Sequence, residues 1–145
     1  MTRAPRGLLD TSVVVALGET DPATLPEVCV VSAVTLAELS AGPLVTDDPR
    51  EQAARQARLQ QAEQDFAPVP FDADCARAFG QVSADLRAAG RKTTARSYDA
   101  MIAATAVAHR IPLFTLNPDD FAHITRLDVR TPSPAPPAPG PQPTG

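Results

Sequence analysis

The sequence has few cysteines, few aromatic residues and no long apolar run. Its two cysteines, Cys29 and Cys75, are too few for a disulfide framework or a cysteine-ligated zinc site. Charged residues interrupt every apolar stretch, which excludes the roughly 20 apolar residues of a membrane-spanning helix. The short apolar stretch Val13–Leu17 lies between two acidic residues and has no small-residue cleavage site after it, unlike a secretory signal. We therefore expect a soluble, cytoplasmic protein with no membrane partner.

The 145 residues suit a single domain with a mobile end. Hydrophobic residues make up 43% of the chain, enough for a core. The net charge of −4 argues against a protein that coats nucleic acid through bulk electrostatics. Seven of the 16 prolines follow Arg130, in a stretch without charge or apolar anchors. We predict a domain over residues 1–130 and a disordered, proline-rich tail over residues 131–145.

Short apolar runs alternate with helical patterns along the domain. Serines at positions 12, 32 and 97 are predicted helix caps, and the segment from Asp47 to Phe66 is predicted to form a long polar helix. The predicted strands are residues 8–10, 28–31, 69–71, 112–115 and 127–129, and the predicted helices are residues 12–17, 33–41, 47–66, 72–90 and 98–109. This alternation predicts an α/β fold, in which a central parallel sheet is covered by helices on both faces.

Three acidic residues stand where a site is expected in such a sheet. Asp10 ends the first predicted strand, Glu38 has apolar neighbours throughout its helix, and Asp99 begins the helix after Ser97. Each also has a structural interpretation. Asp10 can cap a turn, Glu38 can be a protonated or arginine-paired core acid, and Asp99 can simply favour the start of a helix.

The three acids together suggest a metal site. Like charges about 4 Å apart repel by about 4 kcal/mol per pair at an effective dielectric constant near 20. The apolar flanking residues supply no fixed cation, so a divalent metal would relieve the repulsion. Oxygen ligands without histidine or cysteine favour Mg²⁺ or Mn²⁺ over Zn²⁺.

Four segments, in order along the chain, resemble one known family. They are Leu8-Leu9-Asp10-Thr11-Ser12-Val13, Val31-Ser32 with Thr35-Leu36-Ala37-Glu38-Leu39, Asp99-Ala100-Met101-Ile102-Ala103-Ala104-Thr105-Ala106, and Leu113-Phe114-Thr115-Leu116-Asn117-Pro118-Asp119-Asp120-Phe121. The sequence resembles PIN-domain ribonucleases, and among them the VapC-type toxins of type II VapBC toxin-antitoxin systems. The resemblance spans Leu8 to about Val129.

The resemblance implies a PIN-like three-layer α/β/α sandwich and an endoribonuclease that depends on Mg²⁺ or Mn²⁺. A metal-activated water would attack the RNA phosphodiester and leave a 5′-phosphate and a 3′-hydroxyl. Asp10, Glu38 and Asp99 match the first three acids of the family and would be catalytic residues and metal ligands. Many members have an aspartate where this chain has Asn117. Asn117 would be the fourth catalytic residue, and the fourth metal ligand could be Asn117, Asp119 or Asp120, of which Asp120 is the expected one. Hydroxyls that orient the carboxylates and water would come from Thr11, Ser12 and Thr115.

Substrate and protein partners follow from the same resemblance. The one dense basic stretch precedes Asp99 and is a candidate RNA-binding surface, although a solubilising loop would look the same; it contains Arg87, Arg91, Lys92 and Arg96. A VapB-type antitoxin and a homodimer are expected, and the predicted helix at residues 50–66 offers a groove wall for a partner helix.

Two other functions compete with a toxin nuclease. A haloacid-dehalogenase-type phosphatase also begins with an aspartate after its first strand, but it needs a second acid at the position of Ser12 and a lysine elsewhere. A catalytically impaired PIN-like binding or regulatory module is conceivable because of Asn117. The acids Asp10, Glu38 and Asp99 argue against that module.

Overall fold

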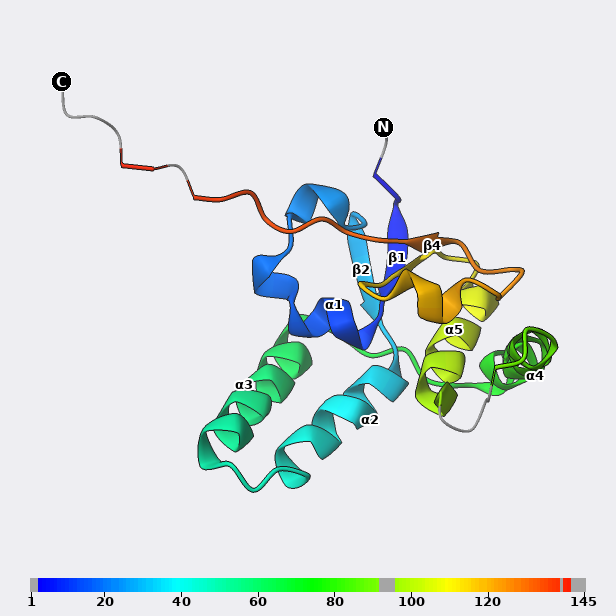
Figure 1. The fold of residues 1–145 in the computed structure, drawn as a ribbon, viewed down its shortest axis with the longest axis horizontal. Helices are drawn as coiled ribbons and strands as arrows, with labels where there is room; N and C mark the ends of the chain where they lie inside the picture. The colour runs from blue at the N-terminus through cyan, green and yellow to red at the C-terminus, as the bar shows by residue number, and fades with distance from the viewer. Residues whose placement is uncertain (1–2, 92–95, 139, 142–145) are drawn as a thin grey trace.

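Four short parallel strands form the centre of the molecule (Figure 1). The computed structural model describes residues 3–91, 96–138 and 140–141. Strands β1 (Arg6–Leu9), β2 (Val28–Val31), β3 (Leu113–Phe114) and β4 (Val129–Arg130) lie in the order β2-β1-β3-β4, and every neighbouring pair is parallel. The strands are rich in apolar residues because a parallel sheet is buried on both faces. The predicted parallel sheet is confirmed.

Helices cover both faces of this sheet. Leu8 and Leu113 join one apolar cluster with α4 (Ala73–Ala88) and α5 (Ser97–His109). The next residues along the same strands, Leu9 and Phe114, join a second cluster with α1 (Thr11–Val15), since side chains alternate between the faces of a sheet. Figure 1 shows α4 and α5 on the side of the sheet away from α1. The predicted α/β/α sandwich is confirmed.

A helical pair projects beyond the sheet. Helix α2 (Ala33–Ala41) ends at the turn η3 (Gly42–Leu44), and α3 (Pro49–Asp65) returns beside it (Figure 1). The Ser32 hydroxyl accepts a hydrogen bond from the backbone N–H of Val34 at 3.0 Å, as predicted for a cap. Helix α2 also packs against α1 and α5, which places it beside the carboxyl ends of the strands. Three further short 3₁₀ turns are η1 (Leu17–Glu19), η2 (Pro22–Thr24) and η5 (Pro118–Phe121).

Gly7 lets β1 approach the ring of Phe114 closely. A Cβ atom at position 7 would lie 2.5 Å from Phe114 Cε1 and 2.8 Å from Cδ1. Real side chains essentially never come so near, so a larger residue would displace the ring or the strand. Asp10 directly follows this strand, so the packing of Gly7 also fixes where Asp10 lies.

Several predicted element boundaries are wrong. The predicted strand at residues 69–71 is only an isolated bridge between Val69 and Ser32, because prolines on both sides of Val69 have no N–H to extend a ladder. The last strand is β4, shifted from the predicted 127–129. Asp10, not Ser12, occupies the N-cap of α1, and α5 begins at Ser97 itself, with Arg96 in the N-cap position.

The first residues of the proline-rich segment pair with the domain. The backbone N–H of Asp21 donates to the carbonyl of Ser133 at 2.9 Å, and the N–H of Ala135 donates to the carbonyl of Glu19 at 2.8 Å. Thr20 and Pro134 form an antiparallel bridge. The domain therefore includes contacts beyond residue 130, and the disorder predicted for the rest of the tail stays a prediction. None of the helices in the described residues is long and apolar enough to cross a bilayer.

Candidate functional site

Asp10 is a buried carboxylate held by three hydrogen bonds. Its side chain lies at the carboxyl end of β1 and the residue is 4% exposed. Oδ1 accepts from the backbone N–H of Thr11 at 2.8 Å. Oδ2 accepts from Ser12 Oγ at 2.9 Å and from Thr115 Oγ1 at 2.8 Å. Because β1 and β3 are neighbours, Thr115 after β3 reaches Asp10 after β1, and this contact fixes the orientation of the carboxylate.

Glu38 enters the same region from α2. Thr11 Oγ1 donates a hydrogen bond to Glu38 Oε1 at 2.8 Å and lies 3.0 Å from the hydroxyl of Thr35. Burial raises the pKa of Glu38; the Thr11 hydrogen bond lowers that pKa, and the nearby charge of Asp10 raises it. The predicted apolar setting of Glu38 thus contains a hydroxyl partner. Thr11 links the first and second acids of the predicted set.

Asp99 lies in the first turn of α5 and is partly buried. Burial, followed by the negative charges of Asp10, Asp120 and Glu38, raises the pKa of Asp99 to about 6, and the charge of Arg96 opposes this shift. Four carboxyls from β1, α2, α5 and η5 therefore share one electrostatic environment. All four are acids that the sequence suggests as metal ligands, and burial together with the negative charge of its neighbours accounts for the raised pKa of Asp99.

Among the three alternatives for the fourth position, Asp120 is the one with an electrostatic effect on Asp99. Asp120 forms an ion pair with Arg96 and interacts electrostatically with Asp99. Asn117 and Asp119 are exposed, and the backbone N–H of Asn117 donates to Thr115 Oγ1 at 3.0 Å. Of the three alternatives, Asp120 is thus the residue whose carboxylate interacts with the other acids.

The donor chemistry of the site fits a hard divalent cation. All the converging side chains offer oxygen, and their mutual repulsion is relieved by positive charge. Among the residues that the structure describes, however, no three Asp, Glu, His or Cys side chains lie close enough together to enclose an ion as they stand. The charges of the acids therefore act on one another, but their side chains would have to move to form a closed set of ligands.

The described residues of the predicted RNA-binding stretch lie at the end of α4 and the start of α5. Arg87 is exposed in the last turn of α4, and the backbone N–H of Arg91 donates to the carbonyl of Leu86. Arg96 is neutralised by Asp120, and Lys92 lies outside the described residues. Of the described members of this set, Arg96 is the one whose charge acts on the acids.

Sequence reasoning missed two arginines of α3 that border the site. A cavity of about 210 Å³, here called the α2–α3 cavity, is lined by Thr11, Val15, Glu38, Leu39, Gly42, Arg55 and Arg58. The sequence placed Arg55 and Arg58 on solvent-facing sides of a polar helix. Their spacing to Ala62 could have indicated this. Ala62 follows Arg55 by seven residues and Arg58 by four, residues at these spacings share a helix face, and Ala62 is buried.

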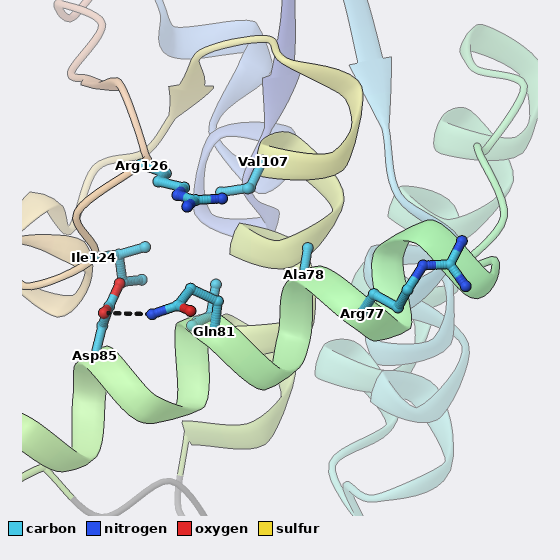
Figure 2. Close-up of a pocket in the computed structure, with 8 residues that line it drawn as sticks. Arg77, Ala78, Gln81, Asp85, Val107, Ile124 and Arg126 are labelled. Atoms are coloured by element: carbon cyan, nitrogen blue, oxygen red, sulfur yellow. Dashed lines mark hydrogen bonds between the residues drawn. The ribbon is translucent and has the colours of Figure 1, made fainter.

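One further hollow lies away from the acids. It has a volume of about 340 Å³ and lies between α4, the end of α5 and the segment at Ile124 and Arg126 (Figure 2). Its acid, Asp85, accepts hydrogen bonds from the backbone N–H and hydroxyl of Thr125 at 3.1 and 3.0 Å and from Gln81 at 3.2 Å. These bonds anchor the segment after η5 to α4. We therefore interpret Asp85 as a structural residue.

Comparisons with known proteins agree with this geometry. Residues 7–127 match the PIN domain family. Ribonuclease VapC5 of Mycobacterium tuberculosis (strain ATCC 25618 / H37Rv) is 36% identical over 124 residues, which cover 83% of this chain and 89% of the relative. Ribonuclease VapC4 of the same organism is 38% identical over 129 residues, covering 87% of this chain and 96% of the relative.

A similar solved structure comes from the same organism. It is the crystal structure of VapBC-5 from Mycobacterium tuberculosis, a member of the VapBC family of toxin-antitoxin systems. The likeness has a TM-score of 0.75 and 32% sequence identity, and it covers 89% of this chain and 98% of the other.

Proposed function

We propose that this chain, which belongs to the PIN domain family, is a metal-dependent endoribonuclease toxin controlled by an antitoxin. The main structural support is the grouping of Asp10, Glu38 and Asp120 around Asp99, whose pKa is raised to about 6 by burial and then by the charges of these three acids. Oxygen ligands of this kind suit Mg²⁺ or Mn²⁺. The relatives named ribonuclease VapC, and the VapBC toxin-antitoxin structure, support RNA as the substrate and a VapB-type antitoxin as the partner. A homodimer and a cytoplasmic location belong to the same proposal.

The four acids would bind the metal, and neighbouring hydroxyls would orient two of them. Asp10, Glu38 and Asp99 would hold the metal, and Asp120 would join them after releasing Arg96. When bound, a divalent ion supplies positive charge at the phosphate and lowers the pKa of the attacking water. Ser12 and Thr115 keep Asp10 Oδ2 oriented, and Thr11 does the same for Glu38 Oε1. Any proton that Asp99 carries near neutral pH would leave its carboxyl as positive charge enters the site.

Family membership and the retained acids weaken the competing interpretations. A haloacid-dehalogenase-type phosphatase belongs to a different family from the one matched. A binding or regulatory module would not need hydroxyls that orient buried carboxylates. A protein that fails to cut RNA would nevertheless support the binding or regulatory module.

Cleavage of RNA tests the proposal. The purified protein, freed of any partner, should cut single-stranded RNA with Mg²⁺ or Mn²⁺ and stop when EDTA is added. Asp10→Asn should fold and fail to cut, because the amide keeps the shape of the side chain and removes its charge. Activity that survives EDTA would contradict the metal mechanism, and an inactive parent protein would favour the binding module.

Co-expression tests the partner. Expression of the chain alone should arrest growth, and co-expression with the small protein encoded beside it should restore growth and yield a co-purifying complex. An arginine of the antitoxin would match the geometry of the carboxylates and neutralise them. If no neighbouring small protein binds, the chain acts as a stand-alone nuclease.

A further inference from the structure

Arg58 is the cation of the α2–α3 cavity that makes an ion pair but, among the described residues, no side-chain hydrogen bond. Arg55, its neighbour on the same helix face, donates to Glu51 Oε1 at 3.1 Å and to the carbonyl of Gly42 at 2.9 Å. Arg58 Nη1 lies 3.8 Å from Glu51 Oε1, beyond hydrogen-bond distance, and its side chain is 44% exposed. In the described part of the chain, no hydrogen bond holds the Arg58 guanidinium. Arg55 therefore stabilises the turn between α2 and α3, whereas the N–H donors of Arg58 stay available for a ligand.

Arg58 also connects two adjoining cavities. It lines the α2–α3 cavity together with Glu38 and Thr11, and it lines a second cavity of about 370 Å³ between α1 and α3. Val15 borders both as well, so the two cavities adjoin at Val15 and Arg58, and we refer to them together as the groove between α1 and α3. The remaining lining of the second cavity is Val14, Leu17, Gly18, Gln61, Ala62, Asp65 and Phe66. An extended polymer that is bound at the acids and continues along this groove would therefore pass Arg58.

The positive charge of the α2–α3 cavity indicates which kind of ligand group Arg58 would bind. Two arginines line the α2–α3 cavity, and Glu51 is their one ion-pair partner among the described residues. An anionic group next to Glu38 would therefore meet, on the α3 side, the Arg58 guanidinium, whose N–H donors make no hydrogen bond to the described residues. On the α5 side, Arg96 is already paired with Asp120. A phosphate is the anion that recurs along an RNA strand, and arginine binds phosphate oxygens with well-defined geometry.

We propose that Arg58 binds the phosphate next to the scissile one and so positions single-stranded RNA in the groove between α1 and α3. This inference rests on the proposed ribonuclease function and names the arginine that guides its substrate. Arg58 is a positioning residue in this scheme, since it stands beside the acids and does not act on the reacting phosphate. It places part of the RNA path on α3, whereas the basic stretch before Asp99 predicted a path on the other side.

RNA affinity without cleavage tests the inference. Binding of a fluorescently labelled, short single-stranded RNA is measured by anisotropy in EDTA, for the parent protein, Arg58→Gln and Arg58→Lys. We expect Arg58→Gln to weaken binding about fivefold, to a similar degree for RNAs of different sequence, with a salt slope smaller by about 0.7. Arg58→Lys should recover part of the affinity because it restores the charge without the planar fork.

A matched control lies on the same helix. Arg50→Gln removes the same charge from an exposed position in the first turn of α3, and it should leave the affinity unchanged. In single-turnover cleavage, Arg58→Gln should raise the RNA concentration for half-maximal rate about fivefold and leave the rate at saturation within about twofold of the parent. A change in the half-maximal RNA concentration without a change in the saturating rate distinguishes a role in positioning the RNA from a disturbance of the acidic site.

The outcomes distinguish this inference from the proposed function. If the parent cuts RNA and Arg58→Gln binds and cuts like Arg50→Gln, the role of Arg58 is refuted and the ribonuclease stands. If the parent binds RNA through Arg58 but does not cut it with either Mg²⁺ or Mn²⁺, the proposed ribonuclease is refuted and the RNA contact stands. If Arg58→Gln weakens only antitoxin binding, the groove belongs to the protein partner and the inference is overturned. A parent protein that binds no RNA refutes both.

Discussion

Replacing Asp99 by asparagine should stabilise the metal-free protein, although the same change should disable cleavage. The pKa of Asp99 is raised from 3.8 to about 6, first by burial and then by the charges of Asp10, Asp120 and Glu38. An acid with a raised pKa binds its proton more tightly in the folded state than in the unfolded state. Stability therefore falls as the pH rises from about 4 to about 6, and the whole penalty is present above that range. Asparagine cannot ionise and escapes the penalty.

The size of this effect follows from the same pKa. At 1.36 kcal/mol per pKa unit, a rise from 3.8 to about 6 corresponds to about 3 kcal/mol. Asp99 is only partly buried, so solvent screening reduces the penalty, and the substitution also loses about 0.5 kcal/mol of favourable interaction with the start of α5. We expect a net gain of about 1 to 2 kcal/mol for Asp99→Asn above pH 6.

Thermal unfolding in EDTA measures the gain. The melting temperature of Asp99→Asn should exceed that of the parent by about 3 to 6 °C near pH 8 and by far less near pH 4.5. Glu63→Gln is the matched control, since it removes one charge from an exposed position on α3 that does not line the α2–α3 cavity. If Asp99→Asn melts no higher than the parent near pH 8, Asp99 does not suffer the burial and repulsion on which the site depends.

Three further outcomes test the site and the sheet that carries it. Asp10→Asn should slow single-turnover cleavage at least about 100-fold, equivalent to about 2.7 kcal/mol, and a variant with a near-parental rate would remove Asp10 from the site. In metal titrations of cleavage, Asn117→Asp should lower the concentration for half-maximal rate because it adds charge, and Asp120→Asn should raise it; curves that overlay the parent would exclude both residues as ligands. Gly7→Ala should destabilise the protein by about 1 to 3 kcal/mol in urea unfolding, because its Cβ would lie 2.5 Å from Phe114 Cε1. An unchanged midpoint would show that the sheet relaxes freely there.

Local sequence patterns predicted the elements that carry Asp10 and Glu38, because each of those elements has a clear start or end signal. The apolar run before Asp10 predicted its place at the end of β1, and Ser32 predicted the start of the helix that carries Glu38. The convergence of the acids followed from the parallel sheet, since the carboxyl ends of parallel strands lie on one edge. Those features depend on contacts that are near in sequence or fixed by the class of fold.

The features that sequence reasoning missed depend on contacts distant in sequence. Arg58 borders the site only because α3 returns beside α2, and its helix looked uniformly polar. The sequence named Asp120 as one alternative for the fourth ligand, but it did not predict the ion pair of Asp120 with Arg96 between η5 and the start of α5. The pairing of Ser133 with Asp21 joins segments more than a hundred residues apart, and composition alone predicted a free tail there.

The chemistry of the cleaved RNA ends tests the central claim most directly. A metal-activated water that attacks phosphorus leaves a 5′-phosphate and a 3′-hydroxyl, whereas attack by the neighbouring 2′-hydroxyl leaves a 2′,3′-cyclic phosphate and a 5′-hydroxyl. The products made by the purified protein with Mn²⁺ can be distinguished by ligation and by phosphatase treatment of the ends. The account predicts 5′-phosphate and 3′-hydroxyl ends that disappear with Asp10→Asn. Cyclic phosphate ends, formed equally in EDTA, would contradict it.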